Sequence, residues 1–356
     1  MRALRLLAWE SVPQLVEVPV PTPGEGEVLI RVAGNGLCHS DLTMMDMPAE
    51  IGEMLGWHLP FTLGHEIAGT VAAIGPCVDD GDDTWTLGDA AVLMSANSCR
   101  RCRYCLGGRE SLCERGLAGR GYGRDGGLAD FVVAPVADLV RWSGPADALA
   151  DAGTLSDAGA TSFHAVSRVL GVLERAVGEG HAPFVVVIGV GGLGAFAVQF
   201  LAALTEATII AIEPNETRRR RALELGAHHA LDGVDRATVK AVRSITGSSG
   251  AEAVIDLVGD DDTIACGLKV LAKGGAYALV GAEGGTVASP WVSALPHEAE
   301  IFTFQGSRPD HVRRVVELAA NGAVRVESER FGLDDVAVAY DGLRAGSLTR
   351  RAVIVP

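Results

Sequence analysis

Positive charge is scarce in this chain. Of its 356 residues, 30 are lysine or arginine and 45 are aspartate or glutamate, so the formal net charge is −15. A surface of that sign repels phosphate groups, which argues against nucleic acid or an anionic membrane as the main partner. The apolar run in the opening segment MRALRLLAWE is too short for a signal peptide, and we find no repeat of solenoid period and no low-complexity segment. We therefore expect a cytoplasmic protein of about two domains.

Cysteine is also uncommon, with seven residues, but four of them lie close together. They follow the spacing C-x2-C-x2-C-x7-C, formed by Cys99, Cys102, Cys105 and Cys113. In a reducing compartment this crowding favours a metal over disulfides, because cysteines three apart can direct their thiolates at one tetrahedral ion. An iron–sulfur cluster is the alternative, but its bacterial motif closes with a three-residue gap and a proline. The spacing predicts a structural zinc without an open position for a substrate.

Two further cysteines, Cys77 and Cys266, fit no metal spacing, and we expect both to be small buried hydrophobic residues. The arginines among the clustered cysteines, Arg100, Arg101 and Arg103, are expected to offset the thiolate charge. These expectations leave one cysteine, Cys38, for separate consideration.

Residues 184–204 form a long apolar stretch, FVVVIGVGGLGAFAVQFLAAL. Its β-branched start predicts a strand buried on both faces, and apolar residues recur at helical spacing from Leu193 onward. The turn between them holds Gly189, Gly191, Gly192 and Gly194. Backbone N–H groups at a helix start, with no Cβ atoms in the way, are a place for a diphosphate. A membrane span is the alternative that the length allows.

A carboxylate follows the glycines at the distance that the dinucleotide fingerprint requires. The apolar strand predicted over residues 207–212 ends at Glu213, roughly 20 residues downstream, where the fingerprint places an acid for the adenosine ribose hydroxyls. Because a carboxylate repels a 2′-phosphate, NAD is predicted over NADP. Basic Arg218 lies at the head of a four-arginine run that is otherwise expected to be a solvated helix face.

Strands and helices alternate through the middle of the chain. Strands are predicted at residues 253–258 and 276–280, and a helix at 216–225, so residues 159–303 should form an α/β domain with a doubly wound parallel sheet. The strand ends at Val258, Gly259, Val280 and Gly281 are predicted contacts of the nicotinamide and its ribose.

The first segment, residues 1–158, has a different pattern. Short apolar runs such as 27–32 and 68–74 are broken by glycine and proline, which predicts a mainly β domain. Residues 304–356 return to short strands, with candidates at 325–327 and 352–355.

Two residues of the first segment, Cys38 and His65, could each be an inert buried side chain. Together with a carboxylate at a strand end, however, they could converge on one catalytic zinc, which needs three protein ligands and one open position. The motifs GLCHSD, GHE, the four cysteines and GVGGLG, in this order, resemble the zinc-dependent medium-chain alcohol dehydrogenases, and most of all the bacterial secondary-alcohol dehydrogenases.

The resemblance implies a Rossmann domain and a mainly β, GroES-like catalytic domain that residues 304–356 rejoin. It implies catalytic zinc at Cys38 and His65, with Asp157 replacing the cysteine that is the third ligand in many members, although Asp157 could instead cap a helix. It further gives roles to Glu66 as a carboxylate that can approach the metal, Ser40 as the start of a proton relay, Asp41 as the residue that orients His65, and His39 as a cofactor contact.

The resemblance also implies roles near the cofactor and the substrate. Arg218 would lie near the adenosine ribose, and Arg351 would bind the diphosphate unless it is a plain surface residue. Met45 and Trp57 would line a channel for a hydrophobic alcohol.

The implied activity is NAD-dependent oxidation of alcohols, secondary ones above all, and the reverse reduction of ketones or aldehydes. Zinc would lower the pKa of the alcohol hydroxyl, Ser40 would pass the proton toward solvent, and hydride would move to nicotinamide. Two zinc ions per chain, a small-molecule substrate and a homodimer or homotetramer are expected. A zinc-free quinone or enone reductase, a polyol dehydrogenase and a non-enzymatic use of the same fold stay open.

Overall fold

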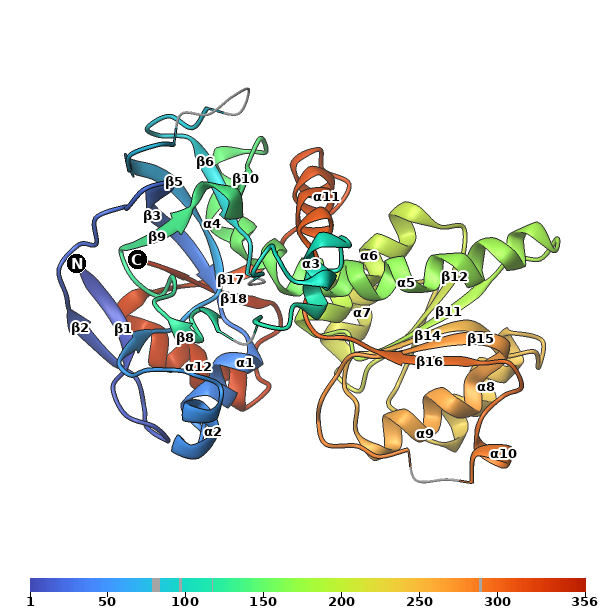
Figure 1. The fold of residues 1–356 in the computed structure, drawn as a ribbon. Helices are drawn as coiled ribbons and strands as arrows, with labels where there is room; N and C mark the ends of the chain where they lie inside the picture. The colour runs from blue at the N-terminus through green and yellow to red at the C-terminus, as the bar shows by residue number, and fades with distance from the viewer. Residues whose placement is uncertain (79–83, 96–97, 117, 288–289) are drawn as a thin grey trace. The chain divides into compact units, whose positions relative to one another are not determined.

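The computed structural model describes residues 1–78, 84–95, 98–116, 118–287 and 290–356, and it divides into two compact units (Figure 1). Unit 1 comprises Met1–Ala160 and Gly306–Pro356, and unit 2 comprises Thr161–Gln305. The sequence placed the two boundaries after residues 158 and 303, which is two residues earlier in both cases. Unit 1 is therefore discontinuous in the chain, with unit 2 inserted between its two parts.

Unit 2 is built on a parallel sheet of six strands, in the order β13-β12-β11-β14-β15-β16. The strands are β11 (Phe184–Ile188), β12 (Thr208–Ile212), β13 (His229–Leu231), β14 (Ala251–Asp256), β15 (Leu271–Leu279) and β16 (Glu300–Thr303). The helices that precede or connect them are α5 (Ala158–Gly178), α6 (Gly192–Leu204), α7 (Glu216–Glu224), α8 (Arg236–Ile245), α9 (Asp261–Val270) and α10 (Trp291–Ala294). Successive strands run to one side from β11 and to the other side from β14. The strand order thus reverses between β11 and β14, and α/β sheets bind ligands at the carboxyl ends of such a pair.

The apolar stretch 184–204 folds as a strand, a turn and a helix. Val185, Val186 and Val187 in β11 are fully buried, as expected for a central strand covered on both faces. The stretch continues as α6, which has 13 residues. Among the residues that the structure describes, none of the helices combines the length and apolar character needed to cross a bilayer. The membrane alternative for this stretch is therefore wrong.

Unit 1 contains a larger, mostly antiparallel sheet, in the order β10-β6-β5-β3-β18-β17, with β9 also paired to β3. Its strands are β3 (Glu27–Gly36), β5 (Glu66–Ile74), β6 (Ala90–Leu93), β9 (Phe131–Pro135), β10 (Leu139–Arg141), β17 (Ser328–Gly332) and β18 (Arg351–Val355). Smaller sheets join β1 (Arg2–Leu6), β2 (Gln14–Glu17) and β4 (Phe61–Thr62), and β7 (Gly119–Arg120) with β8 (Gly123–Arg124). The helices are α1 (His39–Met45), α2 (Ala49–Met54), α3 (Arg103–Leu106), α4 (Leu149–Ala152), α11 (Pro309–Ala320) and α12 (Val336–Arg344). A mainly β unit matches the sequence prediction.

The C-terminal strand completes the main sheet of unit 1. β18 pairs antiparallel with β3 and parallel with β17. The strand expected at residues 325–327 is wrong, because pairing with β18 begins only at Ser328, opposite Arg351. Ser328 and Arg330 also hold β17 in place by donating hydrogen bonds to the carboxylate of Asp151 over 2.6 to 3.0 Å.

The glycine turn of unit 2 provides a test of close packing. A Cβ atom at Gly194 would lie 1.9 Å from the carbonyl oxygen of Gly189, whereas one at Gly191 would have nothing within 4 Å. We expect Gly194→Ala to destabilise unit 2 by about 1–3 kcal/mol, the usual cost of overpacking. Thermal unfolding followed by circular dichroism should show a lower Tm for Gly194→Ala and an unchanged Tm for Gly191→Ala. Equal Tm values for the two variants would contradict the close approach.

Candidate active site

Neighbouring strands of unit 1 bring the candidate ligands together. β3 lies between β5 and β18 and is antiparallel to both, with Gly36 paired to Glu66 on one side and to Val353 on the other. The end of β3 therefore lies beside the start of β5. Cys38 follows the end of β3, and His65 immediately precedes β5. Residues that are distant in the sequence thus meet because of strand register.

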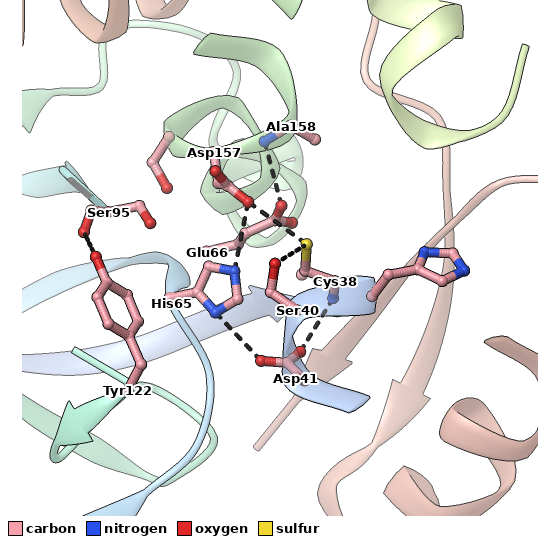
Figure 2. Close-up of polar contacts among 12 residues, drawn as sticks. Cys38, Ser40, Asp41, His65, Glu66, Ser95, Tyr122, Asp157 and Ala158 are labelled. Carbon is pink, nitrogen blue, oxygen red and sulfur yellow. Dashed lines mark hydrogen bonds and ion pairs between the residues drawn. The ribbon is translucent and has the colours of Figure 1, made fainter. Parts of the chain in front are cut away.

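Asp157 approaches from a third direction. It lies between the short 3₁₀ helix η4 (Gly153–Ser156) and α5. The backbone N–H of Ala158 donates to Oε1 of Glu66 over 3.2 Å, which ties this junction to β5. Although Asp157 does occupy the position before a helix, its carboxylate is directed toward Cys38 and His65 (Figure 2). The side chain is therefore available as a ligand.

The donor atoms of Cys38, His65 and Asp157 lie within 4.8 Å of one another. Asp157 Oδ2 is 3.5 Å from the Cys38 sulfur and 3.3 Å from Nε2 of His65. Ligands held at 2.0–2.3 Å from a tetrahedral zinc are roughly 3.4 Å apart, so these separations suit a single ion. One thiolate, one imidazole and one carboxylate form a donor set that zinc accepts, and a fourth position would be left for substrate.

Asp41 holds His65 from the side opposite its ligand nitrogen. Oδ1 of Asp41 lies 3.2 Å from Nδ1 of His65, and its Oδ2 accepts a hydrogen bond of 3.0 Å from the backbone N–H of Cys38. Asp41 is completely buried in the first turn of α1. One carboxylate therefore positions two candidate ligands at once, as carboxylates next to metal-binding histidines often do.

The electrostatics of this group favour positive charge. Burial lowers the pKa of the His65 imidazole, but Asp41 and Asp157 outweigh it, and the pKa of His65 is raised well above its usual value. Burial acts to raise the pKa of Asp157, but its hydrogen bond and charge interaction with His65 lower that pKa to about 2. Asp157 is consequently a carboxylate at any physiological pH. A metal cation would replace the proton as the positive charge that these carboxylates stabilise.

Glu66 and Arg351 form a buried ion pair behind the ligands. The Glu66 side chain is fully buried, and Arg351 is 8% exposed. Nε of Arg351 lies 3.2 Å from Oε2 of Glu66, and its Nη2 contacts Oε1. Burial raises the pKa of Glu66 to about 7, although the Arg351 guanidinium acts in the opposite direction. The alternative of Arg351 as a surface residue is therefore wrong, and its contact with a cofactor diphosphate stays a prediction.

The four clustered cysteines also share one centre. Their sulfur atoms lie within 4.8 Å of one another, with 3.5 Å between Cys102 and Cys105 and 3.9 Å between Cys99 and Cys105. Four thiolates at 2.3 Å from one zinc are about 3.8 Å apart. Backbone N–H groups of Cys105 and Glu114 lower the pKa of Cys102 to about 6, which favours the thiolate. The geometry fits one tetrahedral ion.

The other expectations for cysteines and arginines have mixed outcomes. Arg100 forms an ion pair with Asp138, and Arg103 lies 3.3 Å from a carboxylate oxygen of Glu114, so these guanidinium groups pair with carboxylates. Cys266 is buried as expected, but Cys77 is exposed. The backbone of Cys77 has a φ of +57° in the turn that follows β5. The pattern of apolar residues around Cys77 in the sequence did not indicate that this side chain would be exposed.

The glycine turn and the acid lie together at the carboxyl edge of the sheet in unit 2. Oε2 of Glu213 accepts a hydrogen bond of 2.8 Å from the backbone N–H of Val190, within the turn. Oε1 of Glu213 lies 3.9 Å from the guanidinium of Arg218. Glu213 is 3% exposed, and its hydrogen bond to Val190 holds the carboxylate beside the glycine turn. The dinucleotide fingerprint places an acid at this position. The other expected contacts at this edge are Leu193, Val258, Gly259, Val280 and Gly281, which follow β11, β14 and β15.

The expected substrate residues have other surroundings. Met45 and Trp57 are 3% and 6% exposed and pack in the apolar core of unit 1 with Leu6, Phe61 and others. Their contact with a substrate stays a prediction. His39 and Ser40 are exposed on α1, and the Ser40 hydroxyl lies 3.6 Å from the Cys38 sulfur.

Sequence reasoning missed Tyr122. The centroid of its ring lies 6.0 Å from that of His65, edge-on, and 6.3 Å from that of Trp57. Its hydroxyl donates to the carbonyl of Ser95 over 2.9 Å (Figure 2). Tyr122 lies in a glycine-rich segment without periodicity, between β7 and β8, so no local pattern marked it.

Comparison with known proteins agrees with these features. Residues 24–144 match the family described as alcohol dehydrogenase GroES-like domain, and residues 192–321 match the family described as zinc-binding dehydrogenase. The chain is 32% identical to D-arabinose 1-dehydrogenase (NADP(+)) of Saccharolobus solfataricus, over 99% of this chain and 97% of that protein. It is also 32% identical to an NAD-dependent alcohol dehydrogenase of Sulfurisphaera tokodaii, over the full length of both.

Solved structures show the same similarity. The alcohol dehydrogenase of Aeropyrum pernix has a TM-score of 0.86 and 30% identity, with 100% of both chains covered. The acetophenone reductase of Geotrichum candidum in complex with NAD has a TM-score of 0.82 and 25% identity, over 100% of this chain and 97% of that one.

Asp41 is the residue through which the position of His65 can be tested. We expect Asp41→Ala to weaken metal binding at Cys38, His65 and Asp157 by about 10–100-fold, the usual effect of losing such a partner. Competition with a chromogenic chelator would measure the affinity. Asp46→Ala is the matched control, because Asp46 caps the C-terminal end of the same helix and its side chain is 74% exposed. Unchanged affinity in Asp41→Ala would contradict the proposed support.

Proposed function

Because the chain belongs to the medium-chain, zinc-type alcohol dehydrogenase family, we propose that it oxidises alcohols with NAD at a zinc held by Cys38, His65 and Asp157. The observation that carries the proposal is the approach of these three donor atoms to within 4.8 Å. Secondary alcohols are the proposed substrates, and ketones are the products. The similar acetophenone reductase bears the name of a ketone substrate, which supports this choice.

The protein residues in this reaction bind, orient and move protons. Bound zinc would supply a Lewis acid that lowers the pKa of the alcohol hydroxyl. Ser40 accepts the hydroxyl proton and passes it to solvent, because its side chain is exposed and lies 3.6 Å from the Cys38 sulfur. Thr43 occupies the place where some family members have a relay histidine, so the relay ends at Ser40 in this chain. Asp41 keeps Nε2 of His65 directed at the ion.

The cofactor proposal depends on the edge of the sheet in unit 2. Bound NAD would accept the hydride from the alcohol carbon. The N–H groups at the start of α6 would face its diphosphate, and Glu213 would accept hydrogen bonds from the adenosine ribose hydroxyls. Relatives named for NAD and for NADP are each 32% identical to this chain, so similarity favours neither cofactor. The proposed preference for NAD therefore depends on Glu213.

The second metal has a structural role in this proposal. The four thiolates of Cys99, Cys102, Cys105 and Cys113 fill a tetrahedral coordination sphere, so substrate has no position on that ion. The zinc would hold the segment around α3 and the following 3₁₀ turn in shape. A zinc-free reductase of the same fold would not need the ligand group at Cys38, and a non-enzymatic protein would need only the four cysteines.

Metal content and turnover test the catalytic site together. The unmodified protein should contain two zinc ions per chain by inductively coupled plasma mass spectrometry. Cys38→Ser should lose one ion and at least about 100-fold in kcat, because the loss of several kcal/mol of Lewis-acid stabilisation corresponds to that factor. Cys105→Ser should lose the other ion, and Cys77→Ser, at an exposed cysteine, should keep both. Near-normal turnover of Cys38→Ser would refute the ligand assignment.

Cofactor choice tests the role of Glu213. The unmodified protein should have a higher kcat/KM with NAD than with NADP, because the carboxylate repels a 2′-phosphate. Glu213→Gln should narrow that preference by roughly 10-fold, since it removes one charge interaction near a ribose in a partly buried site. Glu216→Gln, which alters an exposed acid on the following helix, is the control. A preference of the unmodified protein for NADP would show that the interpretation of Glu213 is wrong.

A further inference from the structure

Besides Glu213, a second buried carboxylate lies at the carboxyl edge of the sheet in unit 2. Asp256 is the last residue of β14 and is completely buried. Its Oδ1 accepts hydrogen bonds of 2.9 Å from the backbone N–H groups of both Val258 and Gly259. Its Oδ2 accepts a hydrogen bond of 2.9 Å from the hydroxyl of Tyr277. Three donors therefore bind one carboxyl group, and two of them belong to the turn that follows the strand.

Tyr277 lies in the neighbouring strand β15, where its surroundings fix the hydroxyl that contacts Asp256. The side chain is fully buried in β15, and its hydroxyl also lies 3.4 Å from the carbonyl oxygen of Thr263. A Cβ atom at Gly267 would lie 2.4 Å from that hydroxyl, so the glycine in α9 leaves the space that the phenol occupies. A buried polar pair of this kind is retained at a cost in desolvation that an apolar pair would avoid.

The turn that Asp256 holds borders the glycine turn. A Cβ atom at Gly189 would lie 2.7 Å from the side chain of Val258, so the two turns are in direct contact at the reversal point of the strand order. Gly259 has a φ of +77°, and a Cβ atom there would lie 2.2 Å from the carbonyl oxygen of Gly281. The loop after β15 is joined to the same place, because the N–H of Gly281 donates to the Asp256 carbonyl over 3.1 Å. The backbone position of Val258 is thus held by its hydrogen bond to Asp256.

We propose that Asp256 and Tyr277 are positioning residues for the cofactor: they fix the backbone of Val258 and Gly259 so that the dinucleotide meets a prearranged surface. The inference rests on the proposed function, because it takes NAD as the ligand of this edge. Neither side chain touches the cofactor in this proposal. The carboxylate acts through the two N–H groups, and the phenol keeps the carboxylate in its orientation. Prearrangement matters because a misplaced contact surface lowers affinity without removing any contact residue.

Glu252 provides a matched comparison within the same strand. It lies near the opposite, amino end of β14, and its Oε2 accepts a hydrogen bond of 2.7 Å from the backbone N–H of Phe184. Both carboxylates therefore accept hydrogen bonds from backbone N–H groups, but only Asp256 does so at the carboxyl edge of the sheet. Removal of either should cost stability, and only removal of Asp256 should cost cofactor affinity.

The experiment measures NADH binding by the quenching of protein fluorescence, together with KM for NAD, kcat and Tm. For Asp256→Ala we expect the Kd for NADH and the KM for NAD to rise roughly 10-fold or more, with a smaller change in kcat, because the ligand surface is misplaced while the metal ligands in unit 1 are untouched. Asp256→Asn should restore much of the affinity, since its amide oxygen can accept both N–H groups and its NH₂ can donate to the Tyr277 oxygen. Glu252→Ala should lower Tm and leave the Kd for NADH unchanged.

The outcomes separate this inference from the proposed function. Normal NADH binding by Asp256→Ala, with a fall in Tm like that of Glu252→Ala, would overturn the inference alone and leave a structural role. Failure of the unmodified protein to bind NADH would overturn the proposed function and the inference together. If Asp256→Ala does not fold, Tyr277→Phe provides the test: a several-fold rise in the Kd for NADH supports the inference, and an unchanged Kd overturns it.

Discussion

The antiparallel pairing of β3 with β5 and β18 is the constraint on which the candidate active site depends. Because Gly36 is opposite both Glu66 and Val353, the end of β3 lies beside the start of β5 and the middle of β18. Cys38 follows β3 and His65 precedes β5, and Arg351, the buried partner of Glu66, is the first residue of β18. A shift of one residue in the register of β5 or β18 would turn Glu66 or Arg351 to the other face of the sheet.

Buried charge recurs in both units, and in each case it is compensated locally. Glu66 is paired with Arg351, the His65 imidazole lies between Asp41 and Asp157, and Asp256 receives three hydrogen bonds. Isolated charges at such depth would be strongly destabilising, so every member of each group constrains the others. The same compensation makes the groups rigid, which suits a site that must hold an ion or a cofactor in one geometry.

Much of the fold and part of the site could be predicted from the sequence. The glycine turn, the acid after β12 and the four cysteines depend on spacing over short distances, where backbone geometry is nearly set by residue type. The environments of Met45, Trp57 and Cys77 were harder, because whether an apolar residue lies in a core, a channel or at the surface depends on segments that pack over it. Tyr122 lies beside His65 through packing between distant segments, so no local signal could have found it.

The sequence by itself determined the strand–turn–helix at residues 184–204, the alternation of strands and helices around it, and the clustered thiols, since each depends on propensities and spacings within a few residues of one another. Only the tertiary structure decided that Asp157 meets Cys38 and His65, that Arg351 is buried against Glu66, and that Asp256 supports Val258. Those contacts depend on long-range strand register and on the closing of loops between elements. No local pattern of residues specifies strand register or loop closure over such distances in the sequence.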